Sequence, residues 1–291
     1  MNWQPLAARL LQQLTAMEAR LIELLPSIAI VRFRQEGDAI LIAAPDYYWE
    51  TPSPEQRAEQ ISIKRDYDRL FALLSLILAA GPDDLRRDLA AADSAFRKWL
   101  ELQRNYSLSR DAKRNLAKFN EDAMALHGII DIIAASSAQP LIIVPDTGTM
   151  LEHPDPVQYR AFVGKDGFVF ALLPTVLAEL DDLKADYSRQ KARDLALRAI
   201  RRVKGWRNQG SLREGVKVDG TILVRALHEE PDMDNTLSWL DPTVKDDRIV
   251  ASILQLQAEH PGASLVLITN DVNLLNKADA AAIQATEFPE A

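Results

Sequence analysis

Five acidic residues in the second half of the chain follow or flank apolar segments and could carry chemistry. Asp146 comes directly after the apolar run LIIVP at residues 141–145, and Asp271 ends the segment VLITND. Glu179 lies within PTVLAELDDLK, and Asp246 and Asp247 begin DDRIVASIL. Carboxylates that are brought close together repel one another, so such a group needs a positive charge to stay ionised. A divalent cation would supply that charge.

The kind of cation follows from the donor atoms that the sequence offers. The chain has no cysteine, and its four histidines lack the spacing of a metal-binding motif such as HExxH. Oxygen ligands alone favour Mg²⁺ or Mn²⁺ over Zn²⁺. Such an ion can lower the pKa of a bound water and neutralise charge on a phosphate. We therefore expect a Mg²⁺ or Mn²⁺ site that serves hydrolysis at a phosphate.

Each acid also has a plain structural interpretation, which the sequence leaves open. Asp246 and Asp247 could cap a helix, and an Asp that follows a strand could form a turn. Glu179 could be a solvated acid in the first turns of its helix. The metal site is favoured because all the acids fall at one edge of one predicted sheet. The hypothesis requires that their side chains meet in one pocket.

The elements that must position these acids alternate between two kinds of pattern. Apolar runs predict strands at 141–144, 168–173, 221–227 and 264–269, while helical patterns occupy 174–203, 246–260 and 273–283. WRNQGSLREG is expected to be a loop. This order predicts an α/β fold with a parallel sheet flanked by helices. In such sheets the functional crevice lies beyond the carboxyl ends of the strands.

The first half of the chain predicts a mainly helical domain. Helical patterns cover 4–25, 55–80, 83–104 and 110–136, and Ser53 or Thr51 is expected to cap the second of these helices. The runs IAIVRF and AILIAA, joined by RQEGD, predict a β-hairpin, and DYYWET is expected to be a loop. SSAQP at 136–140 is the best linker, which places the domains at 1–138 and 139–291. The first could dimerise, guide substrate or bind an inhibitor protein.

Composition and charge restrict the setting of the protein. With 47% hydrophobic and 26% charged residues, the 291-residue chain can bury a core. It lacks cysteine and a signal-peptide pattern, and its longest apolar stretch, residues 71–80, is shorter than the ~20 residues of a membrane span. These features favour a cytoplasmic protein with no membrane contact.

The net charge of −8 hides a basic segment at residues 184–213, which carries +8. A helix there would place a basic face opposite an apolar stripe of Ala192, Leu195, Ala199, Ile200 and Val203. Trp206, in the loop expected to follow, could stack a base. The segment is a candidate RNA contact, although a solvated face paired with acids elsewhere explains it equally well. The candidate RNA-binding residues are Lys184, Lys191, Arg198, Arg202, Trp206 and Arg207.

The acidic segments, taken in order, resemble those of a PIN domain, a metal-dependent nuclease module, over residues 141–291. IIVPDT resembles the opening strand and first aspartate of the family, and LPTVLAELDDLK the segment with its glutamate. DDRIVASIL resembles the third acidic motif and VLITNDVNLLNKA the fourth. The resemblance gives catalytic and metal-binding roles to Asp146, Glu179, Asp246 and Asp271, a shared metal role to Asp247, and auxiliary hydrogen bonds to Thr147, Thr269 and Asn270.

This resemblance implies a metal-dependent endoribonuclease that hydrolyses phosphodiester bonds of RNA, most readily single-stranded RNA. Two alternatives remain. A catalytically inactive PIN-like domain could bind RNA or protein, although such a module gains nothing from gathering repelling carboxylates. A phosphatase of the haloacid-dehalogenase type also starts from an aspartate after a buried strand. It requires a second aspartate two residues later, where this chain has Gly148.

Overall fold

The computed structural model describes residues 4–32, 47–79, 81–103, 108–135 and 140–289. The chain divides into two compact units, residues 7–135 and residues 136–291, and the second also takes in the first six residues. The units are described separately below. Among the described residues, none of the helices combines the length and the apolar composition that crossing a membrane requires.

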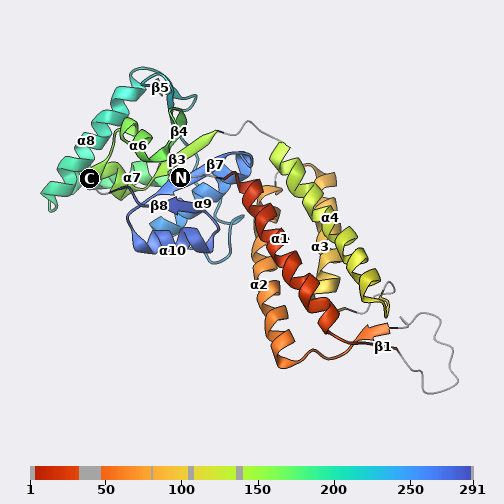
Figure 1. Cartoon of the computed structure of the whole chain (residues 1–291). Coiled ribbons are helices and arrows are strands. Elements are labelled where there is room, and N and C mark those ends of the chain that lie inside the picture. The colour runs from red at the N-terminus through yellow and green to blue at the C-terminus, as the bar shows by residue number, and fades with distance from the viewer. Residues whose placement is uncertain (1–3, 33–46, 80, 104–107, 136–139, 290–291) are drawn as a thin grey trace. The chain divides into compact units, whose positions relative to one another are not determined.

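Residues 7–135 fold mainly as helices, as the sequence predicts. The long helices are α1 (Leu6–Leu24), α2 (Pro54–Ile77), α3 (Asp83–Leu100) and α4 (Ala112–Ala135), and a 3₁₀ turn, η1 (Leu25–Ser27), follows α1 (Figure 1). Each long helix buries one face because its apolar residues recur at the helical period. The resulting core includes Leu14, Leu21, Ile63, Leu74, Phe96, Trp99 and Phe119.

The small hairpin of this unit uses a strand that the sequence did not indicate. Strand β1 (Ile30–Arg32) pairs antiparallel with β2 (Tyr47–Trp49), which belongs to the segment expected to be a loop. Trp49 is buried, so the pairing also places an indole against the core. The run AILIAA, expected to be the second strand, lies outside the described residues.

Ser53, rather than Thr51, caps helix α2. Its hydroxyl accepts from the backbone N–H of Gln56 at 3.2 Å, and the Gln56 side chain accepts from the Ser53 N–H at 2.8 Å. This capping box satisfies two donors that a helix start leaves without partners.

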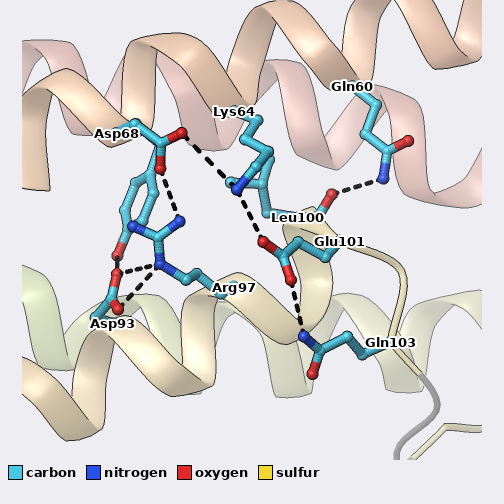
Figure 2. A network of polar contacts seen from close by, with 9 residues as sticks. Gln60, Lys64, Asp68, Asp93, Arg97, Leu100, Glu101 and Gln103 are labelled. Atoms are coloured by element: carbon cyan, nitrogen blue, oxygen red, sulfur yellow. Dashed lines mark hydrogen bonds and ion pairs between the residues drawn. The ribbon is translucent and has the colours of Figure 1, made fainter.

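A polar network fixes α2 against α3 (Figure 2). Arg97 donates to Asp68 at 2.7 Å and to Asp93 at 2.8 Å, and the hydroxyl of Tyr67 donates to Asp93 at 3.0 Å. Lys64 lies 2.8 Å from Glu101, at the end of α3. Because each member has a partner from the other helix, the network restrains the register between α2 and α3.

The second unit contains a six-stranded sheet with the order β5-β6-β4-β3-β7-β8. The strands are β3 (Leu141–Pro145), β4 (Phe168–Leu172), β5 (Val216–Val218), β6 (Ile222–Ala226), β7 (Ser264–Ile268) and β8 (Gln284–Thr286). All neighbouring pairs are parallel except β5 with β6. Every residue of the neighbouring interior strands β3 and β7 is buried, as expected for a parallel sheet covered on both faces. The predicted α/β fold is therefore confirmed.

Helices surround this sheet (Figure 1). They are α5 (Thr147–Glu152), α6 (Arg160–Val163), α7 (Pro174–Ala185), α8 (Gln190–Arg207), α9 (Lys245–Glu259) and α10 (Val272–Ala280), with a 3₁₀ turn, η2 (Pro156–Tyr159), before α6. The prediction of a single helix over 174–203 is wrong, because the helix is interrupted between α7 and α8. At the break the carboxylate of Asp186 accepts from the backbone N–H of Ser188 at 2.9 Å, a local turn that competes with the helix.

Candidate functional site

The candidate site lies where three parallel strands end side by side. Strands β4, β3 and β7 are neighbours in the sheet and run in the same direction. Asp146 follows β3 directly, Asp271 lies three residues beyond β7, and Glu179 lies in the second turn of α7, which follows β4. The strand order thus brings these three acidic segments to one edge of the sheet, as predicted for a parallel sheet.

Asp146 is the most enclosed of these acids, with 6% of its surface exposed. One carboxylate oxygen, Oδ1, accepts from the backbone N–H of Thr149 at 2.7 Å, which caps α5. The other, Oδ2, accepts from the hydroxyl of Thr269 at 2.5 Å. The Asp146 N–H donates to the carbonyl of Ile268 at 3.0 Å. Hydrogen bonds with the end of β7, with Thr269 just after it and with α5 therefore fix both the backbone and the carboxylate of Asp146.

Thr269 joins Asp146 to Asp271. This threonine is fully buried, and its hydroxyl oxygen also accepts from the backbone N–H of Asp271 at 3.0 Å. The side chain of Asp271 caps α10 by accepting from the N–H of Asn273 at 2.7 Å. One hydroxyl thus orients the first carboxylate and the backbone that carries the last one. The auxiliary role expected of Thr269 stays a prediction.

Glu179 is connected to the same edge through Thr147, whose hydroxyl donates to Oε2 of Glu179. The other oxygen, Oε1, lies 3.2 Å from the ammonium group of Lys245, at the start of α9. Only 19% of the Glu179 side chain is exposed. The glutamate is therefore held between a neighbour of Asp146 and a lysine of the third acidic segment.

Asp246 and Asp247 contact a lysine as well. The ammonium group of Lys277, in α10, lies 2.7 Å from Oδ1 of Asp247 and 3.2 Å from Oδ2 of Asp246. Asp247 is nearly buried, and its Oδ2 accepts from the N–H of Asp241 at 2.9 Å. Burial alone would lower the pKa of Lys277, but the two carboxylates outweigh it and raise that pKa. Lys277 therefore offsets part of the negative charge of the third acidic segment.

The acidic side chains contact different hydroxyl and ammonium groups and are not all gathered around one point. Within the described residues, no three histidine or acidic side chains form a group that could hold a metal ion. In this arrangement the carboxylates do not all meet in one pocket, and their shared role in metal binding stays a prediction. The donor chemistry still fits a hard cation, because Mg²⁺ keeps several waters and needs one or two carboxylates. Asp146 is the residue best arranged for that purpose.

Tyr159 lies near Asp146 and is excluded as a base. Its hydroxyl donates to the carbonyl of His153 at 3.0 Å. Burial, and then the negative charge of Asp146, raise the pKa of Tyr159 well above its ordinary value. The phenol therefore stays protonated at neutral pH.

Asn270, the third expected auxiliary residue, has a structural contact. Its side-chain carbonyl accepts from the backbone N–H of Phe288 at 2.9 Å, and the Phe288 ring stacks on His153 at 3.8 Å between ring centroids. Asn270 therefore anchors the C-terminal segment beside Asp271.

The basic segment is divided between two helices and is partly anchored. Lys184 belongs to α7 and lies 2.5 Å from Asp181. In α8, Arg198 donates to the carbonyls of Leu151 and Glu152 at 3.1 Å, and Arg202 pairs with Asp155. Lys191 and Arg207 are exposed on the same helix.

The expected role of Trp206 in stacking a base is wrong. Trp206 lies within α8, not in a loop, and only 3% of its surface is exposed. Its ring meets Phe170 of β4 edge-on, with 6.4 Å between centroids. The indole is therefore part of the core that attaches α8 to the sheet.

Sequence reasoning missed three residues of this site. The backbone N–H of Thr149 donates to the Asp146 carboxylate that caps α5, and its buried hydroxyl donates to the carbonyl of Ile268. Lys245 directly precedes Asp246 and Lys277 lies within NLLNKA, so both were visible as cations beside acidic motifs. Their pairing with acids of other helices was not visible, because it depends on contacts between distant segments.

Comparison with known proteins agrees with this arrangement. A model of the PIN domain matches residues 143–289, which contain Asp146, Glu179, Asp246 and Asp271. A search among curated proteins found no match. The matched residues make up half of the chain, and the chain belongs to the PIN domain family, whose members are generally metal-dependent nucleases.

Proposed function

We propose that residues 139–291 form a metal-dependent endoribonuclease and that residues 1–138 form a separate N-terminal domain. The observation that carries the proposal is the position of Asp146. Its buried carboxylate lies at the carboxyl end of a central strand, and Thr269 connects it to Asp271. A carboxylate whose orientation is fixed by surrounding hydrogen bonds is well suited to bind a cation.

Asp146, Glu179, Asp246 and Asp271 would hold Mg²⁺ or Mn²⁺, with Asp247 beside Asp246. When bound, the ion would supply an activated water and neutralise charge on the phosphate. Asp146 and Asp271 are favoured as the first ligands because neither forms an ion pair in the described part of the chain. Asp246 would have to exchange its contact with Lys277 for the metal.

The chain's own residues orient the acids and balance their charge. Thr147 and Thr269 donate to Glu179 and Asp146, which fixes the direction of both carboxylates. Lys245 offsets the charge of Glu179, and Lys277 offsets part of the charge of Asp246 and Asp247. Hydrogen bonds and nearby cations both favour the ionised form of a carboxylate. These contacts allow the acids to share one edge of the sheet without a metal.

The same lysine contacts favour a second candidate, an inactive PIN domain that binds RNA or protein. Lys245 lies 3.2 Å from Glu179 and Lys277 lies 2.7 Å from Asp247, so these carboxylates already have cationic partners. A binding module could therefore keep its acids without any catalytic use. A cleavage assay must therefore distinguish the nuclease from the inactive binding domain.

The experiment compares cleavage of labelled single-stranded RNA with Mn²⁺ and with EDTA. We expect cleavage with Mn²⁺, none with EDTA, and at least about a hundredfold loss in Asp146→Asn. Asp181→Asn serves as the matched control, because Asp181 is an exposed acid on α7 that is not among the proposed metal ligands. Circular dichroism would verify that each variant is folded.

Two outcomes would overturn the nuclease assignment. Cleavage that persists when Asp146 and Asp271 are both changed to Asn would show that these acids do not carry the reaction. RNA binding without cleavage under any divalent cation would favour the inactive candidate.

A further inference from the structure

Two neighbouring hollows lie between α8 and the segment that starts at α5. The first, of about 450 Å³, is lined by Gly148 and Leu151 on one side and by Lys191, Ala192 and Leu195 of α8 on the other. The second, of about 500 Å³, is lined by Pro154, Gln158 and three arginines of α8. Glu152 borders both hollows. They therefore form one groove along α8, which we call the α5–α8 groove.

The first hollow lies near Asp146, although Asp146 itself lines neither hollow. Gly148 has no side chain, and a Cβ atom at this position would lie 3.7 Å from both carboxylate oxygens of Asp146. Gly148, which lines the first hollow, therefore lies beside that carboxylate. A molecule in this hollow would lie beside the residue that we place at the centre of the site.

The first hollow has apolar walls and a charged border, to which Arg189 and Lys191 contribute cations and Glu152 a carboxylate. Leu151, Ala192 and Leu195 are half-buried and supply the walls, while Lys191 is exposed at the border. Among the described residues, Lys191 has no acidic partner. An apolar wall beside a single free ammonium group matches a flat base with an attached phosphate.

The second hollow is suited to phosphate groups. Arg198 is held by two backbone carbonyls, and Arg202 by Asp155, so both guanidinium groups are fixed in place. Arg201 lies between them in sequence and has no acidic partner within the residues that the structure describes. Arginine forks that are already oriented lose less entropy when they bind a phosphate.

We propose that the α5–α8 groove binds the nucleotide next to the cleaved bond, with its unpaired base in the first hollow and the adjoining phosphates on Lys191, Arg198 and Arg201. This inference rests on the proposed ribonuclease function and adds the place where the RNA next to the cleaved bond binds. A base that is paired in a duplex cannot enter the first hollow, because its edge and faces are already occupied.

The test measures binding separately from cleavage. Fluorescence anisotropy of a short labelled single-stranded RNA is recorded with the full chain in EDTA, at several salt concentrations. Lys191→Glu should weaken binding about tenfold and flatten the salt dependence. Lys204→Glu is the matched control, since Lys204 is exposed on the same helix and lines neither hollow. It makes the same change in charge and should weaken binding by less than about threefold.

A second variant tests the base pocket. Ala192→Phe fills the first hollow without changing charge, and it should weaken binding of normal RNA about tenfold. An RNA of equal length without bases should bind this variant and the wild type alike. Equal effects of Lys191→Glu and Lys204→Glu would overturn the proposal, as would equal loss of both RNAs in Ala192→Phe or no RNA binding by the wild type. If the groove variants behave as expected but Mn²⁺ gives no cleavage, the nuclease assignment fails while the groove assignment stands.

Discussion

Replacing Lys277 with methionine tests whether the acidic edge depends on lysine for its stability. Methionine keeps most of the length and apolar surface of the side chain and removes the charge. In the native chain this ammonium group contacts Asp247 at 2.7 Å and Asp246 at 3.2 Å. The variant leaves two adjacent carboxylates without a cation, and one of them, Asp247, has only 8% of its side chain exposed.

The expected loss follows from burial. Removing one partner of a fully buried ion pair costs about 3–5 kcal/mol, because the other charge stays buried and unpaired. Here 27% of the Lys277 side chain is exposed, and Asp247 keeps its hydrogen bond from the N–H of Asp241. Water therefore screens part of the interaction, and we expect Lys277→Met to lower the free energy of unfolding by about 2 kcal/mol.

Hydrogen exchange of peptides from α9 and α10, measured in EDTA, would localise this loss to the second unit. Lys184→Met is the matched control. Lys184 lies 2.5 Å from Asp181, but 64% of that aspartate side chain is exposed, so its loss should not exceed about 0.5 kcal/mol. Adding Asp247→Asn to Lys277→Met should recover at least half of the lost stability, because the uncompensated charge is removed. Equal losses in the two lysine variants, or no recovery, would refute the reasoning.

Two further predictions concern groups held by hydrogen bonds. Thr269→Val keeps the shape of a fully buried side chain but removes the donor to Asp146 and the acceptor for the N–H of Asp271, and should cost about 2 kcal/mol in chemical denaturation. Unchanged stability would contradict that hydrogen bonding. Burial, and then the charge of Asp93, raise the pKa of Tyr67, so its contribution to stability is complete below the unfolded value of about 10 and is lost as pH rises above it. Denaturation from neutral to alkaline pH should therefore show a smaller loss above pH ~10 in Tyr67→Phe than in the wild type, and equal losses would disprove the shift.

The parts of the site that the sequence predicts are those set by local pattern. The short apolar run before Asp146 favours a buried strand, and a carboxylate that directly follows such a strand lies at the edge of the sheet. The same reasoning places Asp271 after β7, and both residues indeed cap the helix that begins there. Topology then brings the two acids together, since β3 and β7 are neighbours in register from Leu141 to Pro145.

The parts that the sequence does not predict depend on contacts between distant segments. Trp206 occurs in a basic segment, which favoured an exposed role, but Phe170 of a separate strand covers it. The contact between Lys277 and Asp247 joins two helices and could not be inferred from either segment. The edge strands β5 and β8 have three residues each, too short for an alternating pattern to stand out. In contrast, the break after Ala185 did have a local signal, because Asp186 can accept from Ser188, and the helical period obscured it.

The two lysines divide the acidic edge into parts with different electrostatics. Asp146 and Asp271 carry charge that is balanced by hydrogen-bond donors alone, whereas Glu179, Asp246 and Asp247 each lie beside an ammonium group. A cation approaching the first part gains the full attraction of two carboxylates, whereas one approaching the second part must compete with a lysine that is already bound. In the proposed site, a metal ion would therefore be held mainly by Asp146 and Asp271. Lys245 and Lys277 explain how a chain can hold so many acids at one edge of a sheet and still fold before any metal binds.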